Sequence, residues 1–206
     1  MQMNKVKNIT IKGYWKEVLN DCRFTVSKPP LNKEPSDKFK ESIVIAEHSP
    51  IRDLIFKIDF EEIPTWVSVH YARHKWEKYV QTQRTDRTGE DRHSKPQDAP
   101  ISMRCELNTQ HLIDTSRKRL CYQASTETRE LWEELKYELH KIEPIIADAL
   151  VPNCIYRCGC PEMGGCGNVD WWLDKNRDLV DLLDIKERYK IYNDELYAKW
   201  KEIKGE

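Results

Sequence analysis

The feature that most limits the fold of this chain is a strict alternation of residues at positions 54–60. Large apolar side chains occupy every second position, at Leu54, Phe56, Ile58 and Phe60. Charged Lys57 and Asp59 lie among the residues between them. A period of two is typical of a β-strand that buries one face and leaves the other in water. A shorter alternation within residues 6–11 predicts another strand, so we expect part of the core to rest on a sheet.

Other segments carry helical or irregular patterns. The predicted elements are helices at residues 14–20, 39–46 and 127–142 and a strand at residues 22–26. Residues 61–64 are predicted to begin a helix, because acidic residues and proline are favoured in a first turn. Residues 103–122 are predicted to form a helix with one face made by Asn108, Leu112, Thr115 and Arg119. The polar residues 85–100 are predicted to form a loop.

Size and composition restrict the class of protein. At 206 residues, with 39% hydrophobic and 33% charged residues, the chain is expected to form one domain over residues 1–206. A net charge of −1 argues against general binding to nucleic acid or membrane surfaces. The sequence contains neither a membrane-length apolar run nor a signal peptide pattern. Its seven cysteines are therefore expected to be reduced thiols in a cytoplasmic protein.

The residues most suggestive of function lie between Thr65 and Arg87. This stretch holds five Lys and Arg, two carboxylates and two His. Arg grips phosphates and anionic heterocycles through two donors at once, so the stretch predicts an anion site for a nucleotide or a cofactor phosphate. Two alternatives remain open: a solvated basic helix end, or a metal pair formed by His70 and His74 from one helix face.

A second unusual segment is rich in cysteine and glycine and covers residues 153–168. Its thiols are Cys154, Cys158, Cys160 and Cys166. Four thiolates separated by flexible glycines fit a structural zinc site, although the paired C-x-x-C spacing of many zinc sites is missing. The alternative is a loop of buried thiols. Residues 170–204 are predicted to form a charged helical extension, which we expect to cover part of the core or a subunit contact.

The basic stretch resembles the signature of the flavin-dependent thymidylate synthases. That family has an Arg-His-Arg triplet followed by a Ser and an Arg. Arg73, His74 and Lys75 match the triplet. Thr82 occupies the position of the family's Ser, and Arg84 occupies the position of the Arg that follows it. The third basic residue differs, the spacing is one residue short, and Val80 replaces a Glu.

The resemblance extends beyond the triplet. The family has an Asn, an Arg eleven residues later, and an Ala and a Glu in the following helix. Asn108, Arg119, Ala124 and Glu127 keep that spacing, and His48 precedes a predicted strand as a His does in the family. Matching pieces therefore span roughly residues 43–143.

The resemblance implies an α+β fold, with an antiparallel sheet packed against helices in one domain. It also implies a homotetramer whose sites combine several subunits. The implied reaction is FAD-dependent methylation of dUMP to dTMP with methylene-tetrahydrofolate and NADPH. Arg119 is the implied catalytic residue, placed near N3 and O2 of the base to stabilise negative charge on the ring.

The resemblance also suggests binding roles, residue by residue. The substrate nucleotide would be bound by His70, Tyr71, Ala72, Arg73, Thr82, Gln83, Arg84 and Arg119. The FAD would be held by His48, Arg73, His74, Lys75, Asn108, Gln110 and Asp114. Two other functions remain open: a related flavin-dependent modification such as hydroxymethyl transfer, or a zinc-stabilised module that binds nucleic acid.

Overall fold

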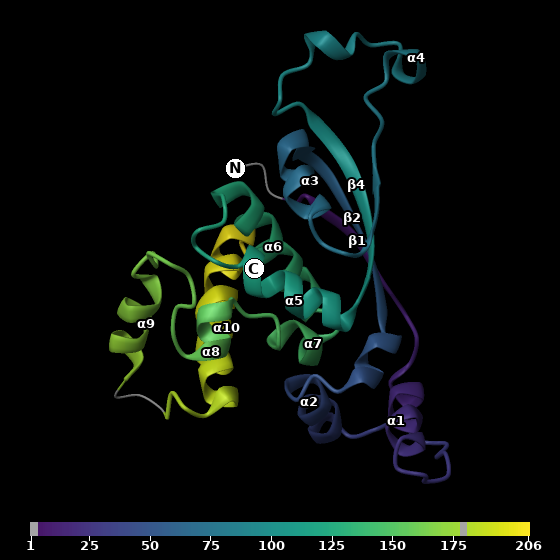
Figure 1. The fold of residues 1–206 in the computed structure, drawn as a ribbon, viewed down its shortest axis with the longest axis vertical. Helices are drawn as coiled ribbons and strands as arrows, with labels where there is room; N and C mark the ends of the chain where they lie inside the picture. The colour runs from purple at the N-terminus through teal and green to yellow at the C-terminus, as the bar shows by residue number, and fades with distance from the viewer. Residues whose placement is uncertain (1–3, 178–180) are drawn as a thin grey trace.

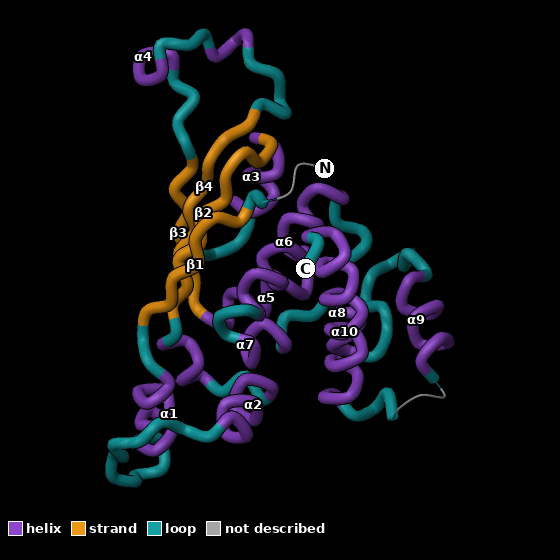
Figure 2. Tube along the Cα trace, turned by 180° about the vertical axis from the view of Figure 1, so that it is seen from behind, coloured by secondary structure: helices purple, strands orange, loops and turns teal. Residues whose placement is uncertain are grey.

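The structure is a computed structural model that describes residues 4–177 and 181–206. The molecule contains a four-stranded sheet (Figure 1). Its strands follow the order β1-β2-β4-β3, and every neighbouring pair is antiparallel. The strands are β1 (Val6–Lys12), β2 (Ile55–Pro64), β3 (Glu77–Val80) and β4 (Pro100–Asn108). The main helices lie on one side of this sheet, as Figure 2 shows, so the fold is α+β.

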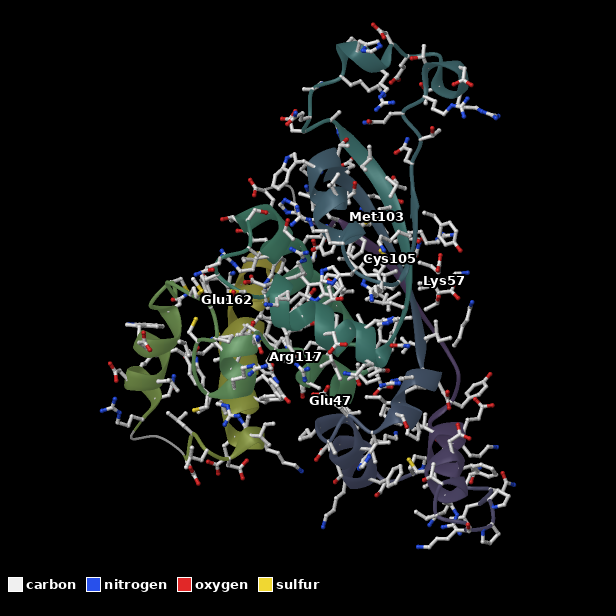
Figure 3. All side chains as sticks on the ribbon, viewed as in Figure 1. Glu47, Lys57, Met103, Cys105, Arg117 and Glu162 are labelled. Atoms are coloured by element: carbon white, nitrogen blue, oxygen red, sulfur yellow. The ribbon has the colours of Figure 1, made fainter. Side chains whose placement is uncertain are left out.

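The alternation at residues 54–60 produces the centre of the core, as predicted. Phe56, Ile58 and Phe60 of β2 are fully buried beneath the helices. On the other face, Lys57 pairs with Glu106 of β4 at 3.2 Å. Figure 3 shows Lys57 on the opposite side of the sheet from the helices. One face of the sheet is therefore apolar and covered, and the other is polar and open.

Helices supply the rest of the architecture. They are α1 (Trp15–Phe24), α2 (Asp37–Ile45), α3 (Thr65–Ala72), α4 (Thr85–Thr88), α5 (Thr109–Arg119), α6 (Thr126–His140), α7 (Pro144–Asp148), α8 (Asn153–Arg157), α9 (Asn168–Asn176) and α10 (Ile185–Lys204). Two short 3-10 helices, η1 (Ser49–Asp53) and η2 (Arg92–Ser94), lie in the connections. The predictions at residues 6–11, 14–20, 39–46 and 127–142 are confirmed in type. Pro144 begins α7, so the helix before it stops as expected.

The strand predicted at residues 22–26 is wrong. Its first residues continue α1, which ends at Phe24, and the chain then turns. Trp15, Val18 and Leu19 are the buried residues of α1, at the i, i+3, i+4 spacing of a helix. Tertiary packing of that face outweighs the strand propensity of the residues that follow.

Two predicted helix starts are also wrong. Residues 61–64 end β2, where Ile63 pairs with Ile101 after a bulge and is fully buried. Residues 103–108 belong to β4, whose Met103, Cys105 and Leu107 alternate into the core. The helices begin only at Thr65 and Thr109.

The C-terminal third packs as smaller hydrophobic clusters beside the main core. One cluster is centred on Val151, Ile155, Trp172 and Tyr189, and another on Tyr137, Leu196 and Trp200. The helical prediction for residues 170–204 is confirmed in α9 and α10, while positions 178–180 lie outside the described residues. No helix in the described ranges is long and apolar enough to cross a membrane.

The link between β1 and α1 depends on a glycine. Gly13 has φ +85°, and a Cβ there would lie 2.4 Å from the carbonyl oxygen of Asp53. Gly89 has a similar φ of +74° but open space around it.

We expect Gly13→Ala to lower the free energy of unfolding by about 2–4 kcal/mol, because the new methyl group adds both backbone strain and overpacking. Gly89→Ala should lower it by only about 1 kcal/mol, because it adds backbone strain alone. Urea denaturation of both variants measures the difference, and equal losses would contradict the close approach.

Candidate functional site

The candidate site forms where the end of α5 meets the end of α3. Arg119, the last residue of α5, donates from Nε to His74 Nε2 at 2.8 Å. Its Nη2 donates to the backbone oxygen of His70 at 2.7 Å. Its third nitrogen, Nη1, has no hydrogen-bond partner within residues 4–177 and 181–206. Two segments distant in sequence thus hold one guanidinium through two of its three nitrogens.

His74 lies in the turn between α3 and β3, because α3 ends at Ala72. Its ring stacks parallel to that of Trp76, with centroids 6.2 Å apart and planes 9° apart. The Trp76 indole N–H donates to Thr115 Oγ1 at 3.2 Å. Thr115 lies one helical turn before Arg119, so α5 positions both partners of the Arg119–His74 contact. Leu112, Thr115 and Arg119 share a face as predicted, whereas Asn108 precedes the helix.

The start of α6 supports the other partner of Arg119. The His70 Nδ1 atom lies 2.9 Å from Thr128 Oγ1. The buried hydroxyl of Tyr71 donates to the backbone oxygen of Thr128 at 2.8 Å. Ser125, which precedes α6, donates to Thr128 Oγ1 at 2.8 Å. These bonds fix the last turn of α3 and with it the carbonyl that Arg119 binds.

Two arginines that form no ion pair with a carboxylate in the described residues characterise the site. Burial lowers the pKa of Arg119, and the nearby Arg73 lowers it further. Burial, with Arg119 next in size, lowers the pKa of His74 to about 4. Burial and the two guanidinium groups also lower the pKa of His70. His74 is therefore neutral near pH 7, and its Nε2 accepts the hydrogen bond from Arg119 Nε–H. In the described part of the chain, neither Arg73 nor Arg119 forms an ion pair with a carboxylate.

Several residues predicted from the sequence come together here. His70, Tyr71, Ala72, Arg73 and His74 form the end of α3 and the turn after it, and Arg119 reaches them from α5. Lys75 lies exposed in the same turn. The supporting roles of Trp76 and Thr128 were not predicted, whereas Thr115 was predicted on the helix face that carries Arg119. The position of Trp76 directly after the triplet was the one available signal for it.

Other predicted cofactor residues gather near the start of α5. Gln110 donates to Glu47 at 2.7 Å and to Asp114 at 3.2 Å. Arg117 forms an ion pair with Glu47, and Figure 3 places these two side chains together. Asp114 is also close enough to His74 to oppose the lowering of its pKa. This cluster therefore borders the Arg119 group.

Asn108 and His48 each lie directly before the helix that follows them in the chain. Asn108 lies before α5, where its side chain accepts from the backbone N–H of His111 at 2.9 Å and caps the helix. His48 is exposed and directly precedes η1. Neither contacts Arg119 through a described hydrogen bond.

Thr82, Gln83 and Arg84 lie elsewhere. They follow β3 into a segment that projects beyond the sheet and away from α5 (Figure 1). Gln83 donates to Thr65 Oγ1 at 3.0 Å, and Arg84 forms an exposed ion pair with Asp86 at 2.7 Å. Within one chain these residues do not join the Arg119 group.

The metal alternatives gain no support. Across the residues that the structure describes, no group of three or more His, Cys, Asp and Glu side chains is arranged to hold a metal ion. His74 lies outside α3, and its Nε2 is occupied by Arg119, so His70 and His74 do not present one helical face. Cys158 points its thiol toward the backbone oxygen of Leu182, at 3.6 Å.

Known structures share this fold. No protein-family model matches the sequence, and no curated protein matches it. Flavin-dependent thymidylate synthase ThyX from Helicobacter pylori, complexed with FAD and dUMP, superposes with a TM-score of 0.57 at 11% identity. The match covers 71% of this chain and 98% of that chain. The UMP/dUMP methylase PolB from Streptomyces cacaoi, bound with 5-Br dUMP, superposes with a TM-score of 0.51 at 12% identity, over 69% of this chain and 94% of that one. At such identities the likeness establishes the fold, and it confirms the expected α+β class.

The contact between Arg119 and His74 predicts the titration of the imidazole. NMR titration should find the pKa of His74 near 4, because burial and Arg119 disfavour the charged ring. Arg119→Ala should raise that pKa toward the ordinary value of about 6.5. Lys118→Ala, an exposed neighbour paired with Glu162, should leave it unchanged. A wild-type value near 6.5 would contradict the contact.

Proposed function

We propose that this protein is a flavin-dependent thymidylate synthase that methylates dUMP to dTMP. The observation that carries the proposal is the Arg119 guanidinium, which His74 and the backbone of His70 hold beside the turn that contains Arg73 and which has no carboxylate partner in the described residues, in a fold shared with structures bound to dUMP and to 5-Br dUMP. Guanidinium groups without counterions favour anionic ligands, and a nucleotide phosphate is such a ligand.

The residues at this site fit a nucleotide and FAD. Arg73, with the backbone of His70 to Ala72, would bind the phosphate and sugar of dUMP. His74 and Lys75 would hold FAD, with Gln110, Asp114, Asn108 and His48 at the border of the site. When bound, FAD supplies the redox chemistry that the side chains lack. The protein's part is binding, orientation and charge.

Arg119 would act on the pyrimidine ring. Its bonds to His70 and His74 fix the guanidinium before substrate arrives, so little reorganisation is needed during the reaction. A guanidinium beside N3 and O2 of the base stabilises negative charge that develops on the ring. This stabilisation is greater in the transition state than in the ground state, and only such a difference accelerates the chemical step.

The complete site would be shared between subunits of a homotetramer. Thr82, Gln83 and Arg84 lie on a segment that extends away from their own chain's Arg119, which supports delivery of these residues to another subunit's nucleotide. Methylene-tetrahydrofolate would provide the carbon unit and NADPH the reducing equivalents. On this proposal an enforced monomer binds flavin poorly and is inactive.

Flavin content tests the cofactor. The purified protein should be yellow, release FAD on denaturation and lose its colour when NADPH is added. Incubation with dUMP and methylene-tetrahydrofolate should then yield dTMP. Hydroxymethyl-dUMP as the product would retain the cofactor and substrate but replace methyl with hydroxymethyl transfer. A colourless protein that contains no flavin and forms no product from dUMP would contradict the proposal.

Arg119→Ala tests the catalytic role. Loss of one preorganised donor to a developing anion should lower kcat about 100-fold or more, while bound FAD is retained. Lys118→Ala is the matched control in the same helical turn and should keep full activity, because its side chain is exposed and pairs with Glu162. Loss of flavin from Arg119→Ala without a specific defect in turnover would show that Arg119 serves the cofactor instead.

A further inference from the structure

A fully buried lysine lies where the last helix packs against the rest of the fold. Lys136 belongs to α6, and 0% of its surface is exposed. Figure 1 shows α10 beside this helix. Lysine is almost never fully buried without a partner of opposite charge, because removing an ammonium group from water is costly. The proposed reaction gives Lys136 no role.

The surroundings of the Lys136 amine compensate a positive charge poorly. Its Nζ donates to the backbone oxygen of Ala147 in α7 at 2.6 Å, which is its one hydrogen-bond partner in the described ranges. The rings of Tyr192 and Tyr197 in α10 face it, with their centroids 5.8 and 5.2 Å from Nζ. A charged amine has three N–H donors, so it would leave two of them without an acceptor here.

The nearest carboxylate on α7 is engaged by other groups. Asp148 accepts from the Tyr197 hydroxyl at 2.8 Å, and its Oδ1 lies 3.1 Å from Nδ1 of His140, which ends α6. Asp148 forms no ion pair with Lys136, although its charge favours the protonated amine. The attraction is therefore one across a distance and not a direct contact.

The remaining ionisable groups nearby belong to α6 and α10. Glu133, three residues before the buried amine, pairs with Lys199 at 2.5 Å and with Arg129 at 3.4 Å. Burial raises the pKa of the Tyr192 and Tyr197 hydroxyls, so both remain uncharged at neutral pH. None of these groups supplies a free negative charge to the amine.

The balance of these effects favours a neutral amine. Burial lowers the pKa of Lys136 to about 7, and Asp148 opposes part of that shift. In water a lysine has a pKa of about 10.4, so the side chain binds fewer protons while α10 is docked than after its release. Acid therefore favours release, and docking strengthens as the pH rises from about 7 towards 10.4. Between pH 6 and pH 8 the docking equilibrium should change about tenfold.

The packing of α10 is separate from the main core. Leu196 and Trp200 of α10 form one small cluster with Tyr137 of α6, and Tyr189 of α10 belongs to another cluster with Ile155. The main core around the sheet contains no described residue of α10. A segment with its own small clusters can open at a lower free energy than the whole domain.

We propose that protonation of Lys136 releases α10 from α6 and α7, which makes the C-terminal helix a pH-sensitive element of the fold. On release, water replaces the missing hydrogen-bond acceptors of the ammonium group. This inference is independent of the proposed function.

Hydrogen exchange of the full chain, followed by mass spectrometry, tests the release. After correction for the intrinsic pH dependence of exchange, the protection of α10 amides should rise about tenfold between pH 6 and pH 8. At pH 6 these amides should also be less protected than those of β2, because α10 opens without unfolding of the sheet. Equal corrected protection of α10 at the two pH values, or α10 protection as high as that of β2 at pH 6, would overturn the proposal.

Two variants assign the effect. Lys136→Met keeps an unbranched side chain without the amine, so it should abolish the rise and protect α10 more strongly than the wild-type protein at pH 6. Lys190→Met is the control and should keep the tenfold rise, because Lys190 is exposed on α10 and pairs with Asp194 at 2.5 Å. An imidazole can also gain a proton in this range, so each variant is compared with the wild-type protein at the same pH. A folded Lys136→Met protein that keeps the rise would overturn the assignment.

The wild-type protein provides a check that needs no variant. NMR titration of the lysine side chains, observed at ¹³Cε, should find one lysine with a pKa of about 7, because the Lys136 amine is buried. If every lysine titrates near the ordinary value of about 10.4, the proposal is wrong.

Discussion

The site depends on one guanidinium held between two segments that leave the sheet at opposite ends. Ile55 of β2 pairs with Asn108 of β4, and Pro64 pairs with Pro100. Helix α3 therefore begins at one end of this strand pair and α5 at the other. With 8 and 11 residues, the helices run about 12 and 16 Å, against roughly 33 Å for the ten residues of β2. Their ends meet over the middle of the sheet, where Arg119 bonds to His70 and His74.

The charge state of His74 decides what this contact can do. A neutral imidazole accepts from Arg119, so the guanidinium is oriented while its charge remains uncancelled. Arg104 and Arg117, in contrast, form ion pairs with Asp59 and Glu47. Arg119 is held by a neutral ring and a backbone oxygen, whereas these two arginines are held by carboxylates.

The sequence predicted the parts of this arrangement that depend on local pattern. The alternation through Phe56, Ile58 and Phe60 gave β2, and the leucine-rich amphipathic segment gave α6. The resemblance to a known family selects Arg73, His74 and Arg119 from the sequence alone. The meeting of His74 with Arg119, 45 residues apart, depends on strand register, which no local pattern specifies. The helix predicted over residues 103–122 forms only at Thr109–Arg119, because residues 103–108 belong to β4, which gains its stability from pairing with β2 and β3.

The visible absorption spectrum of bound flavin gives the most direct test that these cationic groups place a pyrimidine nucleotide against an isoalloxazine ring. Addition of dUMP to the flavin-loaded protein should perturb that spectrum with a saturable dependence on dUMP. Inorganic phosphate at the same concentrations should have no such effect, because it lacks the base that contacts the flavin. A flavin spectrum that dUMP leaves unchanged in the wild-type protein would contradict the account.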